Sequence, residues 1–318
     1  MSEAIASLEA QSFADFEVLA VDDGSVDGTP QILADWAVRD ARVRVMSQPA
    51  AGIVTALERA RGEAGGRYLA RMDADDVSHP ERFAQQFDLM QADASVAVCG
   101  CHVRYFPDEA VRGGARRYEA WMNGSATPGE VEREIFVECP LAHPTFFLRA
   151  DAVAASGGYR KAGWPEDYDL IFRLWEQGGA LAKVPEVLLR WREAPDRLSR
   201  TDPRYSLDAF RDCKVHYLGR TLLAGGRGAV VWGAGPVGKA LARALAAKGT
   251  PVQAFVEVDA RKIGQAIHGA PVLATEEGLQ MADCLHLGAV GQEGARETIR
   301  GLLAGAGKVE LRDFVLTA

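Results

Sequence analysis

The stretch VLAVDDGSVDGTPQIL, residues 18–33, joins an apolar run to two aspartates, a glycine turn and an amphipathic segment. Val18–Val21 predicts a short buried strand, and Thr29-Pro30 is typical of a helix start, where proline follows a capping residue. Leu33 and Trp36 then give that helix an apolar face. A strand that ends in paired acids directly before a helix indicates an α/β fold with polar groups at one edge of its sheet.

The same alternation continues through the first half of the chain. Further strands are predicted at Val43–Met46, Arg67–Met72 and Val96–Val103, with helices at 52–62 and after a capping box at Ser78–Glu81. This pattern favours a mainly parallel sheet flanked by helices. Residues 106–134 are rich in charge and glycine, and we expect them to form a surface excursion.

Composition narrows the class of protein. The 318 residues are 48% hydrophobic and carry a formal net charge of -8, with most of the acidic excess in residues 1–222. We therefore expect no nucleic-acid partner. No apolar run is long enough to span a membrane, and no signal peptide is visible, so a cytoplasmic protein is expected, with peripheral membrane association left open. The five cysteines form no CxxC pair and are expected to be buried thiols.

Three acidic clusters stand at the ends of predicted elements. They are Asp22-Asp23, then Asp73, Asp75 and Asp76 in RMDADD, and then Glu166, Asp167 and Asp169 in PEDYD. Ligands of open α/β sheets bind beyond the carboxyl ends of the strands, and closely spaced aspartates suit a hard divalent cation. A carboxylate at a helix N-terminus is a candidate general base. Each cluster taken singly also fits a turn or a helix cap, but together they favour a catalytic site.

The ordered motifs VDDGS, RMDADD, HPTFFLR and GWPEDYDLIFRLWEQG resemble the family 2 glycosyltransferases of the GT-A fold over about residues 3–220. The resemblance implies a hexosyltransferase-type enzyme of cell-surface glycan synthesis that uses Mn²⁺ or Mg²⁺, mostly with inversion. Its donor would be a nucleotide-sugar, UDP- or dTDP-linked, and its acceptor a saccharide or a lipid-linked oligosaccharide.

The resemblance also implies roles for individual residues. Asp22 and Asp23 would lie at the nucleotide, and Arg71 and Asp73 would help hold the donor. Asp73, Asp75 and Asp76 would form the metal and diphosphate site, with Asp76 or Asp75 as the direct metal ligand. Asp167 would be the general base, with Glu166 as the second choice. His143 and Trp164 are candidates for the acceptor side, although each is also explained by packing.

Two departures from the family pattern stand out. Relatives often carry a histidine after the last core strand, where this chain has Ala194; Arg190, Arg192 and Arg197 can contact diphosphate instead. Relatives also open with an apolar strand, whereas this sequence begins at the following helix. We expect an exposed apolar slot beside Val18–Val21, and we favour a misplaced start over a truncated protein as its explanation.

A second α/β region follows a glycine-rich linker near residue 225. We expect domains at 1–222 and 227–318, the second being a small Rossmann-like accessory domain. In this domain Gly233, Gly235 and Gly238 form a GxGxxG turn between a strand and a helix, and Glu257 stands where a ribose-binding acid belongs. NAD(P) or another nucleotide is one interpretation, and a structural or regulatory role is the favoured one.

Two alternatives to a transferase stay open. One is an NAD(P)-dependent oxidoreductase that uses the C-terminal domain, and the other is a non-catalytic remnant. Metal-dependent hydrolysis of a nucleotide-sugar would indicate the transferase, and nicotinamide reduction would indicate the oxidoreductase. The absence of both would indicate the non-catalytic remnant.

Overall fold

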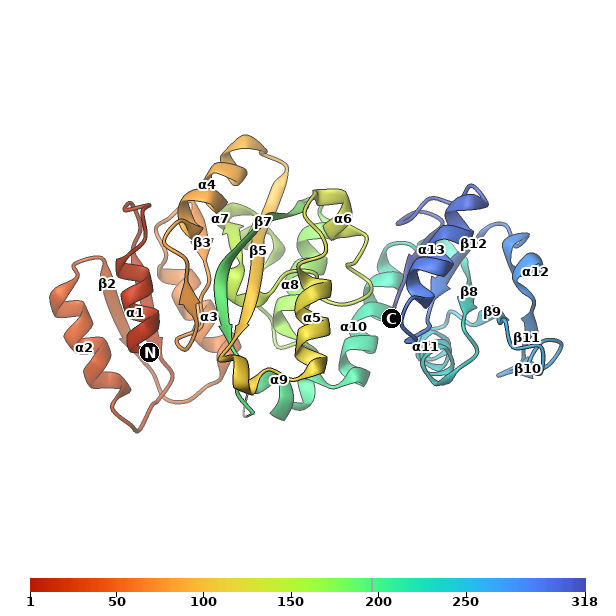
Figure 1. The fold of residues 1–318 in the computed structure, drawn as a ribbon, viewed down its shortest axis with the longest axis horizontal. Coiled ribbons are helices and arrows are strands. Elements are labelled where there is room, and N and C mark those ends of the chain that lie inside the picture. Colours follow the sequence, from red (N-terminus) through yellow and green to blue (C-terminus); the bar gives the residue numbers. More distant parts are fainter. Residues whose placement is uncertain (196) are drawn as a thin grey trace. The chain divides into compact units, whose positions relative to one another are not determined.

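The computed structural model describes residues 1–195 and 197–318, which form two compact units (Figure 1). The first unit comprises residues 1–132 and 140–201, and the second comprises residues 133–139 and 202–318. This division precedes the predicted boundary at 222–227 because α10 (Leu207–Arg220) packs on α11 (Pro236–Ala247). The assignment of functional domains stays a prediction.

The first unit has the predicted alternation of strands and helices. Its strands are β1 (Val18–Asp22), β2 (Val43–Ser47), β3 (Tyr68–Ala70), β4 (Val77–Ser78), β5 (Val96–Phe106), β6 (Phe147–Arg149) and β7 (Ala180–Arg192). Its helices are α1 (Ser2–Glu9), α2 (Thr29–Arg39), α3 (Ile53–Glu63), α4 (Arg82–Ala92), α5 (Gly113–Met122), α6 (Pro128–Glu132), α7 (Ala150–Ser156), α8 (Glu166–Glu176) and α9 (Leu198–Thr201). The predicted α/β class is confirmed.

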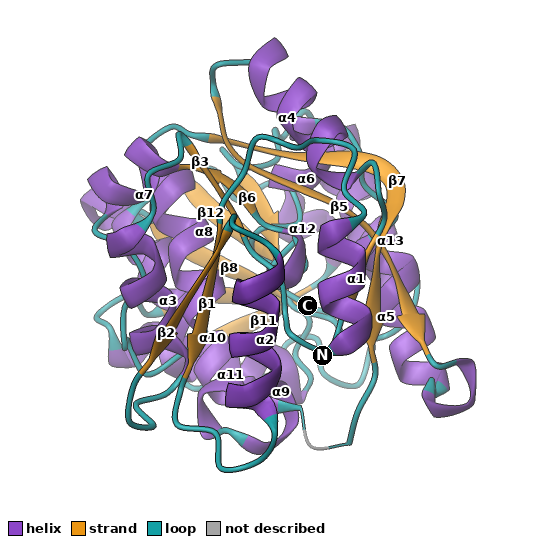
Figure 2. Cartoon of the chain, turned by 90° about the vertical axis from the view of Figure 1, so that its left-hand side faces the viewer, coloured by secondary structure: helices purple, strands orange, loops and turns teal. Residues whose placement is uncertain are grey.

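The strands of this unit form two sheets. β1 and β2 pair in parallel, and Figure 2 shows them between α3 and α2. The larger sheet has the order β3-β6-β5-β7-β4, in which β5 and β7 are parallel while β6 and β4 run antiparallel to their neighbours. β5 is almost completely buried and carries the centre of the hydrophobic core.

Within the described residues, β1 pairs with β2 alone and β3 pairs with β6 alone. Glu17, before β1, accepts a 2.8 Å hydrogen bond from the N–H of Gly65, before β3, while the other ends of the two strands lead to Asp22 and Asp73. The two strands therefore run in the same direction. Both line a cavity of about 1090 Å³ together with α1 and α3, and the apolar residues 18–21 of β1 are only half-buried.

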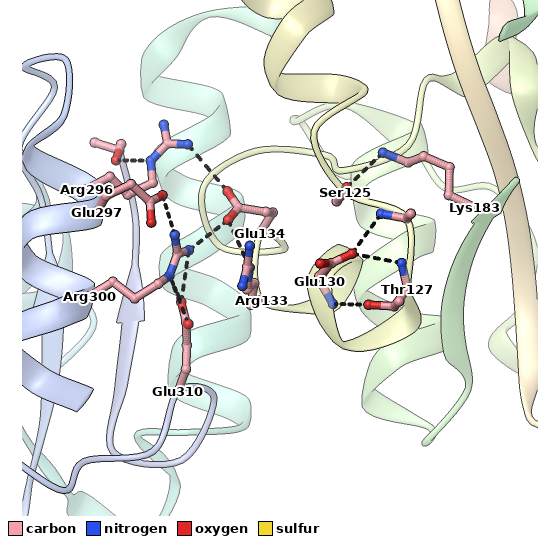
Figure 3. A network of polar contacts seen from close by, with 12 residues as sticks. Ser125, Thr127, Glu130, Arg133, Glu134, Lys183, Arg296, Glu297, Arg300 and Glu310 are labelled. Atoms are coloured by element: carbon pink, nitrogen blue, oxygen red, sulfur yellow. Dashed lines mark hydrogen bonds and ion pairs between the residues drawn. The ribbon is translucent and has the colours of Figure 1, made fainter. Parts of the chain in front are cut away.

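One local prediction was incomplete and another was wrong. Residues 106–134 contain α5 and α6, because Met122 and Val131 are enough to anchor these polar helices in the core. Lys183 reinforces this region by donating a 3.0 Å hydrogen bond to the Ser125 hydroxyl (Figure 3). The proposed capping box also fails: α4 begins at Arg82, and Ser78 is buried in β4.

The second unit is built on a six-stranded sheet. Its strands are β8 (Gly228–Trp232), β9 (Val252–Val256), β10 (Ala266–Ile267), β11 (Ala270–Leu273), β12 (Cys284–Gly288) and β13 (Phe314–Leu316), in the order β10-β11-β9-β8-β12-β13. All pairings are parallel except that of β10 with β11. Besides α10 and α11 the unit contains α12 (Thr275–Leu279) and α13 (Ala295–Gly305).

A charged network explains why residues 133–139 belong to the second unit (Figure 3). Arg300 of α13 contacts Glu134 at 2.7 Å, Glu310 at 3.0 Å and Glu297 at 2.6 Å. Although burial opposes its charge, these carboxylates raise the pKa of Arg300. All five cysteines are buried thiols, as predicted. Within residues 1–195 and 197–318, no helix combines the length and apolarity that a bilayer crossing needs.

Candidate functional site

The first acidic pair stabilises its own loops. Asp22 is buried at the end of β1, and its Oδ1 accepts a 3.0 Å hydrogen bond from the N–H of Ser25. Asp23 accepts hydrogen bonds from the Gln48 side chain at 2.7 Å and from the N–H groups of Ala51 and Gly52 at 2.9 and 2.8 Å. The Gln48 bond, with those of the loop, lowers the pKa of Asp23, so this carboxylate is ionised at neutral pH. The pair therefore orders the loop that leads into α3.

The second cluster converges into a group that can hold a cation. One carboxylate oxygen from each of Asp73, Asp75 and Asp76 lies within 4.8 Å of the others. Oxygen ligands so spaced suit Mg²⁺ or Mn²⁺, which keep further sites for phosphate or water. Asp75 is exposed, Asp73 is half-buried and Asp76 is buried, so the cluster has one open side.

Asp76 is a buried carboxylate of which only one oxygen accepts a hydrogen bond among the described residues. It is 1% exposed, and its Oδ1 accepts a 2.7 Å hydrogen bond from the backbone N–H of Arg192. Its Oδ2 is buried and has no hydrogen-bond partner in the described part of the chain. Burial, with the neighbouring charges of Asp73 and Asp75, raises the pKa of Asp76 to about 7. A buried carboxylate oxygen left unpaired is costly, and a bound cation would satisfy it.

Two arginines place positive charge beside this cluster. Arg71 donates a 2.8 Å hydrogen bond from Nη1 to Oδ2 of Asp73, and a second nitrogen pairs with Oδ1. Arg82 is fully buried beneath the loop, where it donates to the carbonyl of Arg71 and, at 3.1 Å, to Gln86. Burial lowers the pKa of Arg82, while Asp76 opposes that shift. Arg71 thus pairs directly with the cluster, while the charge of Arg82 acts on Asp76 without a direct contact.

The third cluster divides into three roles at the start of α8. Glu166 is fully buried, and Asp167 is half-buried beside it. Burial and the adjacent charge of Glu166 raise the pKa of Asp167, against the effect of Arg71. Asp169 accepts 2.8 Å hydrogen bonds from Trp164 Nε1 and Arg173 Nε, so it braces the helix. The indole N–H of Trp164 is therefore already engaged in a hydrogen bond with Asp169.

His143 lies in a buried pocket next to these acids. Its Nε2 is 3.0 Å from the hydroxyl of Tyr159, and its Nδ1 is 3.8 Å from Oε1 of Glu166. Burial, and then the charge of Arg71, lower the pKa of His143 well below its usual range, so the ring is neutral. Burial raises the pKa of Tyr159, which therefore stays protonated. These contacts favour a structural role for His143 over direct contact with an acceptor.

Arg71 connects the clusters. Its charge acts on Asp73, Asp76, His143, Tyr159 and Asp167. The cavity beside β1 is lined by members of the first and second clusters together with Arg71 and Tyr159. Its polar lining includes Asp22, Asp23, Arg71, Asp73 and Tyr159. The first two acidic clusters therefore meet at one cavity, as their positions at strand ends predict.

Sequence patterns gave no signal for two residues of the site, and they misplaced the contacts of a third. Arg82 and Tyr159 are single residues without a motif, and only folding brings them against the acidic clusters. Arg192 was expected at the diphosphate, yet its side chain pairs with Glu3 and donates to the carbonyl of Asp75. Arg197 pairs with Glu193 at 3.3 Å.

The glycine turn of the second unit is closely packed at Gly238. A Cβ at Gly238 would lie 1.9 Å from the carbonyl oxygen of Gly233, whereas a Cβ at Gly235 would meet nothing within 4 Å. Glu257 accepts hydrogen bonds from the N–H of Ala234 at 3.2 Å and from Lys262 at 2.8 Å. The turn is therefore ordered by its own residues, and nucleotide binding there stays a prediction.

Comparison with known proteins agrees with this geometry. Residues 1–155 match the sequence model of the family described as "Glycosyl transferase family 2". EpsE of Bacillus subtilis (strain 168) is 29% identical over 214 residues, 65% of this chain and 73% of that protein. AmsE of Erwinia amylovora, named as an amylovoran biosynthesis glycosyltransferase, is 27% identical over 201 residues, 63% of this chain and 73% of that protein.

A solved structure shares the fold. Residues 1–349 of TarS from S. aureus, in complex with UDP-GlcNAc, superimpose with a TM-score of 0.55 at 15% identity. The similarity covers 69% of this chain, which spans 62% of that structure. The sequence match covers residues 1–155, which include the first two acidic clusters. This chain therefore carries, over residues 1–155, a domain of glycosyl transferase family 2, and its relatives EpsE and AmsE are named as glycosyltransferases.

Proposed function

We propose that this protein transfers a sugar from a nucleotide-diphosphate sugar to a saccharide or lipid-linked acceptor, with inversion and with the help of a divalent cation. One observation carries the proposal: three aspartate oxygens lie within 4.8 Å of one another, and one of the three side chains, Asp76, keeps a buried oxygen unpaired. Oxygen clusters of this kind suit Mg²⁺ or Mn²⁺. The name of AmsE, an amylovoran biosynthesis glycosyltransferase, supports a biosynthetic role in glycan synthesis.

Each part of the site would then have a defined task. Asp73, Asp75 and Asp76 would hold the cation, which when bound neutralises charge on the departing diphosphate. Arg71 would keep Asp73 in place and bring a fixed positive charge to the same region. Asp22 and Asp23, at the end of β1, would flank the nucleotide at the cavity that they line. Their loop is already ordered by the hydrogen bonds of Asp23, so little ordering remains when the donor binds.

Asp167 is the proposed general base. Its raised pKa matches the requirement that a base be poised near the working pH. It would accept the proton of the acceptor hydroxyl as that oxygen attacks the anomeric carbon, while the diphosphate leaves from the opposite face. This single in-line displacement inverts the anomeric carbon, and it is compatible with separate acidic clusters for the cation and for the proton. Glu166 is fully buried beside His143, so Asp167 is the better-placed carboxylate.

The donor is proposed to be a UDP- or dTDP-sugar. The test is a screen of nucleotide-sugars for release of nucleoside diphosphate with Mn²⁺ or Mg²⁺, first without and then with candidate saccharide acceptors. Release that depends on the cation, and that is lost in Asp76→Ala, supports the proposal. Nicotinamide reduction would favour an oxidoreductase, and the absence of both metal-dependent nucleotide binding and turnover would favour a non-catalytic protein.

For the second unit we propose a structural or regulatory role. Glu257, the residue expected at a ribose, already accepts hydrogen bonds from the glycine turn and from Lys262. Titration with NAD⁺ and NADP⁺, followed by intrinsic tryptophan fluorescence, tests this role. Saturable binding would contradict it.

A further inference from the structure

Arg192 makes two contacts with the aspartate cluster and a third with Glu3. Its backbone N–H donates to Oδ1 of Asp76 at 2.7 Å, and its Nε donates to the backbone carbonyl of Asp75 at 2.7 Å. Its terminal nitrogen forms an ion pair with Glu3, in the first turn of α1. One residue thus contacts two consecutive residues of the cluster and joins them to a distant helix.

Strand register explains why Arg192 reaches this loop. β4 and β7 pair antiparallel, with Val77 opposite Arg190 and Ser78 opposite Leu189. Continuing that register by two residues places Asp75 opposite Arg192. β7 therefore ends beside the aspartate cluster, and its last residue supplies the donors that the loop needs.

The guanidinium of Arg192 is itself held in position. Its central carbon lies 4.2 Å from the centre of the Phe106 ring, a distance typical of a cation–π contact. Arg190 lies 4.3 Å from the same ring, and alternate residues of a strand point to the same side. No hydrogen bond from Arg190 to the aspartate loop occurs in the part of the chain that the structure describes. Both arginines therefore pack against the Phe106 ring, but only Arg192 contacts the aspartate cluster.

We infer that Arg192 is a positioning residue that fixes the Asp73–Asp76 loop in the arrangement that binds the cation, with Glu3 as the anchor of its side chain. The expected effect of Arg192 on metal affinity rests on the proposed function. Its expected effect on the order of the loop rests only on the contacts described above. Residues that orient metal ligands through hydrogen bonds typically change metal affinity 10–100-fold when they are removed.

The experiment compares Arg192→Ala and Glu3→Gln with Arg190→Ala as the matched control. The first readout is amide hydrogen exchange of residues 73–77 in the metal-free, full-length protein. We expect exchange there to rise about tenfold in Arg192→Ala, less in Glu3→Gln, and not at all in Arg190→Ala. Unchanged exchange in Arg192→Ala, or an equal rise in Arg190→Ala, would overturn the inference.

The second readout is Mn²⁺ affinity, measured by electron paramagnetic resonance of the free ion. Arg192→Ala should bind Mn²⁺ at least tenfold more weakly, with kcat at saturating Mn²⁺ close to wild type, and Arg192→Lys should recover part of the loss. Affinity equal to wild type would contradict the positioning role. If wild-type protein binds neither Mn²⁺ nor Mg²⁺ while the exchange difference persists, the proposed metal site fails and the positioning role stands. If Arg192→Ala does not fold, Glu3→Gln carries both readouts, because Glu3 is exposed.

Discussion

The guanidinium of Arg71 pairs with the carboxylate of Asp73, with a 2.8 Å hydrogen bond from Nη1 to Oδ2. Burial raises the pKa values of Asp76 and Asp167, the carboxylates on which metal binding and proton removal are proposed to depend, and the charge of Arg71 opposes that rise. This single cation therefore keeps both groups closer to their ionised forms at neutral pH.

Arg71→Gln should raise the pKa of both carboxylates, because it removes the positive charge that favours their ionised forms. Activity should then rise with pH along a curve displaced to higher pH than in the wild-type protein. The measurement is kcat/KM as a function of pH at saturating Mn²⁺. Arg61→Gln is a suitable control, since Arg61 pairs with Glu58 outside the acidic clusters. A profile that moves to lower pH, or not at all, would argue against this role for Arg71.

Asp167→Asn should abolish the proposed general base while retaining shape and most packing. We expect kcat to fall by about 10²–10⁴-fold with little change in donor affinity, which is the usual loss when a positioned base is removed. Glu166→Gln should reduce kcat less, because Glu166 lies behind Asp167 beside His143. Donor affinity from calorimetry and kcat from product release separate the two effects. Near-normal turnover in Asp167→Asn would place the base elsewhere.

Asp76 should make the stability of the metal-free protein depend on pH. Its pKa is raised to about 7 in the folded state, above the value of about 4 expected in the unfolded chain. The folded state thus binds more protons between these values, and the free energy of unfolding should fall as pH rises from about 4 to about 7. The loss attributable to Asp76 should be on the order of 1–4 kcal/mol.

Urea unfolding of wild type and Asp76→Asn at pH 5 and pH 7.5 isolates this contribution. The free energy of unfolding of Asp76→Asn should fall less between pH 5 and pH 7.5 than that of the wild-type protein. At pH 7.5, Mn²⁺ should raise the free energy of unfolding of the wild-type protein and leave that of the variant unchanged. Identical pH dependence in the two proteins would show that Asp76 is not buried in the way described.

Gly238→Ala should destabilise the second unit, because a Cβ there would lie 1.9 Å from the carbonyl oxygen of Gly233. Relief of that overlap must separate α11 from β8, at a cost of roughly 1–3 kcal/mol. Gly235→Ala is the matched control, since its Cβ meets nothing within 4 Å and its φ of -86° suits any residue. Thermal unfolding of both variants without nucleotide tests this packing role. Equal stability of the two would indicate that the glycines serve a ligand instead.

Much of the fold followed from local sequence signals. Val18–Val21 and Val43–Met46 are short apolar runs bounded by polar residues, and both are strands. The three acidic clusters were found because each directly follows a strand or begins a helix, where ligands are expected. The helices of residues 106–134 were missed because only a few of their side chains, such as Met122 and Val131, are buried.

The remaining parts of the site depend on contacts between distant segments. Arg192 and Glu3 are far apart in the chain, and only the pairing of β7 with β4 brings Arg192 to the aspartate loop. Arg82 carries no motif, and its burial depends on a hydrogen bond to the carbonyl of Arg71. The turn residues Asp22 and Asp23 were expected at the nucleotide, but their hydrogen bonds to Ser25 and Gln48 become visible only in the folded chain.

The central claim is that the Asp73–Asp76 cluster binds a divalent cation needed for sugar transfer. The most direct measurement is the rate of nucleoside diphosphate release from a UDP- or dTDP-sugar as Mn²⁺ is titrated into metal-free wild type and Asp76→Asn. The wild-type rate should rise from near zero to saturation and should return to zero with excess chelator, while Asp76→Asn should stay near zero at every Mn²⁺ concentration. Turnover that survives the chelator, or a normal Mn²⁺ response in Asp76→Asn, would contradict the claim.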